Sequence, residues 1–117
     1  MERKTVIQAI QHWAQWEPKR VAVSDGQAAV CYADFWQRVQ SVAAILQEKG
    51  CGREDRVVVY VRRSVDAIVA IYAALACGSA FVPVDPTAGR RRITYILENC
   101  EAKAILTAGE APETDRP

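Results

Sequence analysis

The sequence predicts an α/β fold: an N-terminal helix and a β-hairpin, followed by two βαβ units that form a small parallel or mixed sheet flanked by helices. Short β-rich runs begin near residues 57, 81 and 104 and alternate with helical patterns, at about the spacing that a strand and its crossover helix require. Residues 75–86 end an apolar helix, turn at Gly78 and continue as a short strand closed by prolines. This run is a helix-to-strand joint typical of α/β domains.

The N-terminal segment predicts an amphipathic helix. Thr5 and Gln8 have the spacing of a capping box, in which each side chain bonds the backbone near the other. Ile10 and Trp13 fall on one helical face, and Pro18 stops the helix near residue 16. We expect the apolar face to pack against another element.

A hairpin and a second helix follow. Residues 21–24 and 28–31 have strand composition, and Asp25-Gly26 supplies the turn between them. From Tyr32 the apolar period becomes helical, and it continues to Lys49-Gly50, where a cation and a glycine are typical of a helix end. The pattern predicts a long amphipathic helix.

The next strand and helix are the most apolar part of the chain. Residues 56–61 form a near-continuous β-branched run, which indicates a strand buried on both faces and paired in parallel. Ser64 can cap the helix over residues 64–77, whose apolar side chains spread around most of its circumference. Such a helix needs cover on most sides, so we expect exposed apolar surface wherever that cover is missing.

The last βαβ unit carries two further signals. Pro83 has no backbone N–H, so the strand at 81–84 should be paired on one side only at that residue. An amphipathic helix then begins at Arg90-Arg91-Arg92 and leads to a strand at 104–107. Residues 1–107 are therefore expected to form one subdomain, and residues 108–117 a polar tail or linker.

Composition excludes several classes of protein. The 117 residues are 50% hydrophobic and 25% charged, with a net charge of +1, which favours one globular domain and gives no field for nucleic acid or anionic membranes. The longest apolar stretch is too short to span a bilayer, and the N-terminus leads into a polar helix rather than a secretion signal. We expect a cytoplasmic protein.

The cysteines give no clear metal site. Cys31, Cys51, Cys77 and Cys100 are widely spaced, and His12 is the single histidine. Zinc sites normally have closely paired ligands, and disulfides are typical of secreted proteins, so free thiols buried as small hydrophobes are favoured over both. We expect His12 to lie at the surface.

The sequence also lacks the usual nucleotide and nucleophile motifs. It contains no G-x-G-x-x-G, no G-x-x-x-x-G-K-[ST] and no G-x-S-x-G. Arg90-Arg91-Arg92 opposes the helix dipole, either as a solvated basic corner or as a docking point for an anion or an acidic surface. Arg62-Arg63 follows a strand end, where α/β sheets bind ligands, but a surface pair is favoured over a phosphate contact.

Several runs resemble the N-terminal portion of the adenylate-forming superfamily, closest to the adenylation domains of nonribosomal peptide synthetases. Residues 31–35 are similar to that family's T-Y-x-E-L element, and residues 92–97 to its R-L-x-Y-M-L element. The central run is similar to its L-K-A-G-x-A-Y-V-P-[IL]-D-P element, matching at Leu75, Gly78, Ala80, Val82, Pro83, Asp85 and Pro86. The resemblance extends from residue 6 to residue 107.

Departures from the family pattern make this an atypical member. Ala76-Cys77 replaces the family's Lys-Ala, Phe81 its Tyr, and Ala88-Gly89 and Arg91 its Tyr-Pro and Glu. Cys31 stands where a capping Thr or Ser is usual, and the loss of a cap costs about 0.5–2 kcal/mol. These changes leave the predicted fold intact.

The resemblance implies a function only for a larger assembly. In the family, ATP, magnesium and the acid substrate are held by segments that follow the matched part, so we assign this chain no catalytic, cofactor-binding or metal-binding residue and no cofactor of its own. Two hypotheses stay open. The chain is a truncated adenylation-like module for interaction or assembly in nonribosomal peptide-type biosynthesis, or it is the N-terminal fragment or split subunit of a complete adenylate-forming ligase.

Both hypotheses predict a protein partner. The expected partner is a second copy of the chain or a synthetase or downstream subdomain, bound through exposed apolar surface, with no role for nucleic acid or membrane. The acid substrate of a complete enzyme and the identity of the partner are open.

Overall fold

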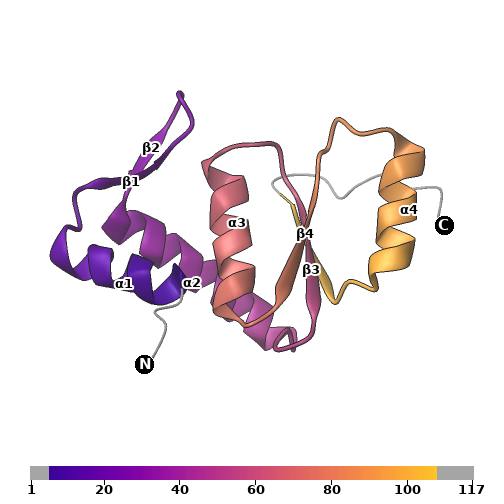
Figure 1. Ribbon diagram of the computed structural model, residues 1–117, viewed down its shortest axis with the longest axis horizontal. Helices are drawn as coiled ribbons and strands as arrows, with labels where there is room; N and C mark the ends of the chain where they lie inside the picture. Colours follow the sequence, from indigo (N-terminus) through magenta and orange to yellow (C-terminus); the bar gives the residue numbers. More distant parts are fainter. Residues whose placement is uncertain (1–5, 108–117) are drawn as a thin grey trace.

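The computed structural model describes residues 6–107 as an elongated body of 48 × 35 × 25 Å. Thr5 and the predicted tail at 108–117 lie outside the described residues. In Figure 1, the hairpin and the first helices lie at one end of the molecule, and the sheet lies toward the other end. They are α1 (Val6–Trp16), β1 (Val21–Ser24), β2 (Ala29–Cys31), α2 (Tyr32–Glu48), β3 (Arg56–Tyr60), α3 (Val65–Ala76), β4 (Ala80–Val84), α4 (Arg90–Cys100) and β5 (Ala104–Thr107).

The larger sheet is parallel and has the order β4-β3-β5. Val58 of the central strand lies opposite Val82 of β4 and Ile105 of β5. Val57 and Val58 have no exposed surface, which confirms the prediction of a strand buried on both faces. Pro83 lies on an edge strand, as its missing N–H requires.

The helices α3 and α4 lie on opposite faces of this sheet (Figure 1). The chain passes from β3 to its neighbour β4 through α3, and then returns across β3 to β5 through α4. Because the two crossovers run in opposite directions along the sheet, crossovers of the same hand place their helices on opposite faces. The predicted pair of βαβ units is therefore confirmed.

Apolar contacts divide into three clusters along the molecule. The first joins α1, the hairpin, α2 and the start of α3, and includes Phe35 and Val39. The second fills the space between α2, α3 and the sheet around Leu46 and Val57. The third lies between the sheet and α4 around Val58. Both faces of β3 are thus covered by described helices.

The first helix packs less completely than its pattern predicts. Ile10 is buried, but Trp13 is 38% exposed and Val6 is 52% exposed. The reason is position: α1 lies at one end of the body and touches chiefly α2, so only the middle of its apolar face is covered. Trp13 instead stacks near Tyr32 and lies under the Arg20 guanidinium, 5.5 Å from the ring centre.

Three helix ends behave as their residues predict. The Ala67 N–H donates to Ser64 Oγ at 3.3 Å, which is the predicted cap of α3. Cys31 precedes α2 without a side-chain cap. Gly78 has φ of 80°, a conformation that favours glycine, and its N–H donates to the Leu75 carbonyl.

The prediction of buried thiols is correct for one cysteine in four. All four are free thiols, but Cys51 alone is buried, and Cys31, Cys77 and Cys100 are half-buried. Those three occupy helix boundaries, where a side chain has neighbours on one side only. His12 is exposed, as predicted, and its ring packs beside Trp13 and Trp16.

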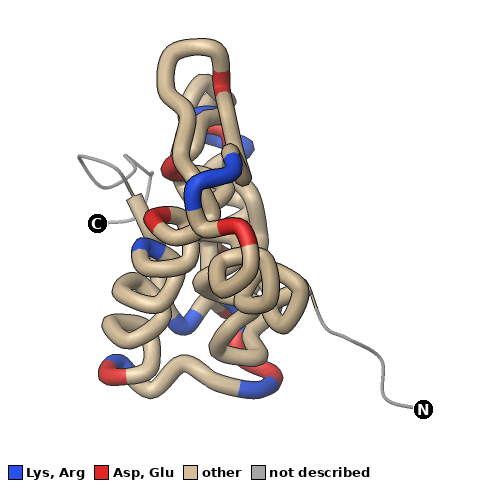
Figure 2. The backbone as a smooth tube through the Cα atoms, turned by 90° about the vertical axis from the view of Figure 1, so that its left-hand side faces the viewer, with Lys and Arg blue, Asp and Glu red and all other residues tan. Residues whose placement is uncertain are grey.

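Charged residues gather in loops and near helix ends, with both signs side by side, in the view of Figure 2. This distribution fits the net charge of +1. None of the described helices is long and apolar enough to cross a membrane.

Candidate functional site

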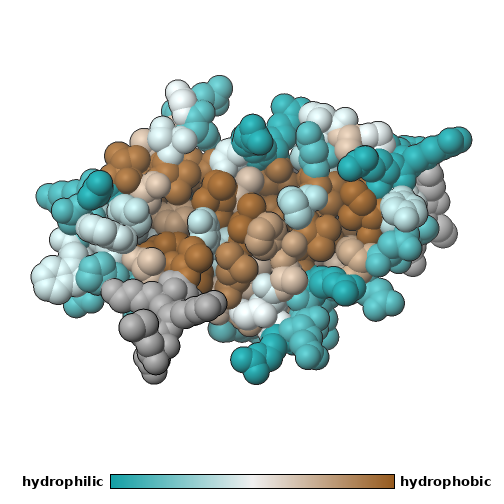
Figure 3. All heavy atoms as spheres, in the orientation of Figure 1, coloured by the Kyte–Doolittle hydropathy of each residue, from teal (hydrophilic) through white to brown (hydrophobic). Residues whose placement is uncertain are grey.

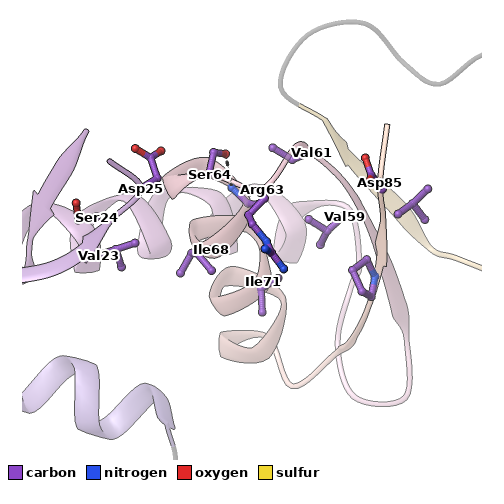
Figure 4. Close-up of a pocket in the computed structure, with 13 residues that line it drawn as sticks. Val23, Ser24, Asp25, Val59, Val61, Arg63, Ser64, Ile68, Ile71 and Asp85 are labelled. Carbon is purple, nitrogen blue, oxygen red and sulfur yellow. Dashed lines mark hydrogen bonds between the residues drawn. The ribbon is translucent and has the colours of Figure 1, made fainter. Parts of the chain in front are cut away.

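An open apolar groove runs along α3, between the hairpin and the edge strand β4 (Figure 4). Its volume is about 1030 Å³. In Figure 3 an apolar band crosses the same face of the molecule, from the hairpin side over α3 to the sheet. The groove combines apolar walls with charged groups at its rim.

The floor of the groove comes from three elements that lie side by side. Ile68 and Ile71 project from α3, Val59 from β3 and Pro83 from β4, while Val23 of β1 forms the opposite wall. Branched apolar side chains suit a surface that excludes water, because each buried methylene favours association by about 0.8 kcal/mol. The floor of the groove therefore presents apolar surface.

The uncovered apolar surface expected near the helix at 64–77 is a concave strip beside α3 rather than a bare face of the helix. The apolar side chains of α3 are buried or half-buried, because α2, the hairpin and the sheet each cover part of the helix. What stays open is the concave strip between those neighbours. The largest exposed hydrophobic side chains lie on other elements, including Phe81 of β4 at 37% and Ile105 of β5 at 42%.

Asp25 forms one polar end of the groove and anchors the hairpin to α3. Its Oδ1 accepts from the N–H groups of Gln27 at 2.9 Å and Ala28 at 2.8 Å, and its Oδ2 accepts from Val65 N–H at 3.1 Å. These three backbone donors, Ala28 first, lower the pKa of Asp25 below its usual value. A charged carboxylate at this point fits the N-terminus of α3.

Asp85 forms the other polar end, directly after β4. Its Oδ1 accepts from the N–H of Thr87 at 2.9 Å and from the Thr87 hydroxyl at 2.8 Å. These bonds, with smaller effects from Arg62 and Arg63, lower the pKa of Asp85. Oδ1 of this carboxylate is thus bonded within its own loop, and the residue lines the rim of the groove.

The two arginine clusters of the sequence occupy different places. Arg62 and Arg63 are exposed after β3, and Arg63 lines the groove, extending over α3 in Figure 4. Arg90-Arg91-Arg92 is exposed at the start of α4, on the opposite face of the sheet. The structure therefore does not bring the two clusters together.

The described residues hold no cluster suited to a metal ion. Within residues 6–107, no three His, Cys, Asp or Glu side chains come together as a metal site requires. The absence of catalytic and ATP-binding residues stays a prediction. From the sequence, Asp25 is expected only as a turn residue. The Asp-Gly turn indicates the hydrogen bonds of Asp25 within the hairpin, but no neighbouring residue indicates its bond to Val65, 40 residues away.

Comparison with known proteins identifies the family. The model of the AMP-binding enzyme family matches residues 10–117. This chain belongs to that family. The resemblance predicted from the central run is thereby confirmed, and the matched part is the N-terminal region of an adenylation domain.

Curated relatives of this AMP-binding chain are nonribosomal peptide synthetases. It is 37% identical over 109 residues to a probable non-canonical nonribosomal peptide synthetase, CymA, of Salinispora arenicola, covering 92% of this chain and 1% of the relative. It is 34% identical over 104 residues to tyrocidine synthase 2 of Brevibacillus parabrevis, covering 89% of this chain and 3% of that relative. The chain thus spans a very small part of the relatives' length.

Solved structures show the same fold. The N-terminal subdomain of Klebsiella oxytoca NpsA, in complex with 3-hydroxybenzoyl-AMSN, matches with a TM-score of 0.80 and 24% identity, over 95% of this chain and 28% of that chain. The crystal structure of IdnL1 matches with a TM-score of 0.83 and 28% identity, over 98% of this chain and 23% of that chain. The α/β arrangement described above is thus the arrangement of an N-terminal adenylation section.

Proposed function

We propose that this chain is an assembly module: the N-terminal section of an adenylate-forming domain of nonribosomal peptide type, without adenylating activity of its own. Its role is to bind, through the groove along α3, the polypeptide that follows this section in a complete domain. That polypeptide belongs either to a separate chain or to a continuation of the same one. ATP, magnesium and the acid substrate are then used by the assembled domain.

The observation that supports this role is the uncovered groove in a section that covers 28% of the NpsA subdomain. In this proposal, the remaining part of the subdomain covers Ile68, Ile71 and Pro83 along the groove. Burial of a strip of this kind favours binding through the hydrophobic effect. Asp25, Asp85 and Arg63 at the rim give a polar border, as in typical protein interfaces.

A binding experiment tests the proposed occupant. The 117-residue chain is mixed with the polypeptide that follows the matched section in the Salinispora relative, and complex formation is measured by size-exclusion chromatography with light scattering. Ile71→Asp, which places a charge in the groove, should weaken the complex at least tenfold. Tyr95→Asp is the matched control, because Tyr95 is 67% exposed on α4, away from the groove.

Three results would contradict the proposed binding partner. The chain could stay monomeric and bind nothing, or Ile71→Asp and Tyr95→Asp could weaken the complex equally. In the third result, the chain forms a homo-oligomer through Ile71 in place of the complex. Circular dichroism confirms that each variant is folded.

The cytoplasmic location of the protein is a further proposal, which fractionation of the producing cell would test.

A second experiment tests the absence of independent activity. Purified chain is assayed for ATP–pyrophosphate exchange with a panel of amino and carboxylic acids, and no exchange above the rate without enzyme is expected. Robust exchange by the 117 residues alone would contradict the proposal. Exchange that appears only when the complementing polypeptide is added would support it.

A further inference from the structure

Cys51 and Cys77 lie in two loops that are bonded to each other at the amino end of the sheet. Cys51 follows α2, and Cys77 ends α3. The Ser79 hydroxyl donates to the carbonyl of Gly52 at 2.7 Å, and the Ala80 N–H donates to the carbonyl of Asp55 at 2.9 Å. The loop before β3 and the loop before β4 are therefore held together over several residues.

The two thiols share one apolar environment. Cys51 is 5% exposed and belongs to the cluster of Leu46, Val57 and the small residues of α3, and Cys77 packs against the same cluster. Cys77 is half-buried, and its Sγ donates to the Ala43 carbonyl at 3.4 Å. Burial, and then the nearby Cys51, raise the pKa of Cys77. Cys51 and Cys77 therefore both line the apolar space between the two bonded loops.

We propose that Cys51 and Cys77 are a redox-active pair that forms an intramolecular disulfide with a low-molecular-weight disulfide such as oxidised glutathione. The half-buried Cys77 loses its proton and attacks the glutathione disulfide, which releases one glutathione thiolate and leaves a mixed disulfide. Cys51 then loses its proton, attacks Cys77 Sγ and releases the second glutathione thiolate. The two protons pass to the two released thiolates, so the protein is oxidised by two electrons and the glutathione is reduced by two.

The disulfide would staple the α2–β3 loop to the α3–β4 loop. The two joined loops lie at the amino ends of β3 and β4, whereas the groove lies toward the carboxyl ends of these strands at Val61 and Asp85. The staple therefore leaves the groove residues untouched, and its existence is independent of the proposed function. It also closes a loop in the unfolded chain, which reduces the conformational freedom of that state.

The experiment oxidises the whole chain with glutathione disulfide at about pH 8.5, where more thiolate is present. Intact mass and peptide mapping should show the loss of two hydrogen atoms and a linked pair of peptides containing Cys51 and Cys77, both reversed by reductant. The oxidised protein should melt about 5 °C or more above the reduced protein. Cys77→Ala should abolish the link, and this change leaves only a small apolar side chain at a half-buried helix end.

Cys100→Ala is the matched control, because Cys100 is also half-buried at a helix end but lies with α4 on the opposite face of the sheet. This variant should form the Cys51–Cys77 link at the wild-type rate. The proposal is overturned by a stable glutathione adduct on Cys77 without the internal link. Links of Cys51 or Cys77 to Cys31, Cys100 or a second chain, or a linked protein with an unchanged or lowered Tm, would overturn it equally.

Discussion

The two sides of α3 differ in cover although both are apolar in sequence. Toward α2 and the sheet, Ala73 and Ala74 have no exposed surface, and they pack close to Leu46. Toward the groove, the larger Ile68 and Ile71 are half-buried. Ala73 and Ala74 thus face neighbours that lie within residues 6–107, and Ile68 and Ile71 face a space that those residues do not fill. The closed side of α3 therefore stabilises this section, and the open side is available for binding.

The largest effect is expected on the closed side. Leu46→Ala removes a side chain that is 1% exposed between α2 and α3, so the free energy of unfolding should fall by about 2–5 kcal/mol. Urea unfolding followed by circular dichroism measures the change. Equal destabilisation by Ile45→Ala, a neighbour that is 51% exposed, would contradict this account of the core.

Overpacking sharpens the same comparison. Ala74→Leu inserts a large side chain where no surface is exposed, and it should cost about 1–3 kcal/mol of unfolding free energy. Ile71→Leu, on the groove side, conserves volume and should cost less than about 1.5 kcal/mol. The two variants are compared in parallel by thermal unfolding. If Ile71→Leu were the more destabilising, the groove side would be packed as tightly as the closed side.

A smaller effect is expected at the start of the helix. Ser64→Ala removes the oxygen that accepts from Ala67 N–H, so stability should fall by about 1 kcal/mol. Ser64→Asp retains an acceptor and adds a favourable charge near the helix N-terminus, so it should keep most of the stability. Equilibrium unfolding of both variants measures the contribution of the cap. Ser64→Ala with wild-type stability would show that the cap contributes nothing.

The smallest effect is expected on the stability of the folded chain at acidic pH. Asp25 and Asp85 both have pKa values lowered in the folded chain from the ordinary value of 3.8. Their stabilisation is therefore complete above the unfolded pKa and is lost as the pH falls through the lower folded values. Tm measured from neutral to acidic pH should fall in that window, and less steeply for Asp25→Asn. Parallel acid profiles for the variant and the wild-type chain would contradict the role of Asp25 as a charged acceptor.

Local patterns predicted most of the elements. The ends of α1 and α2, the hairpin turn, the cap at Ser64 and the left-handed Gly78 follow from residues within a few positions of each feature. Pro83 even indicated which strand lies at an edge, because its missing donor is a property of one residue. The groove was foreseen only as uncovered apolar surface near α3, with no location or lining residues.

The sequence by itself determined the kind, order and approximate bounds of the elements, because hydrophobic period, glycine and proline act over a few residues. Only the tertiary structure decided the strand order β4-β3-β5 and the bond from Val65 to Asp25. It also decided the meeting of the Cys51 and Cys77 loops and the side of α3 that stays open. These features depend on which distant segments pack together. The apolar circumference of α3 allows several such arrangements, and the choice is made by the fit of whole elements rather than by any one of them.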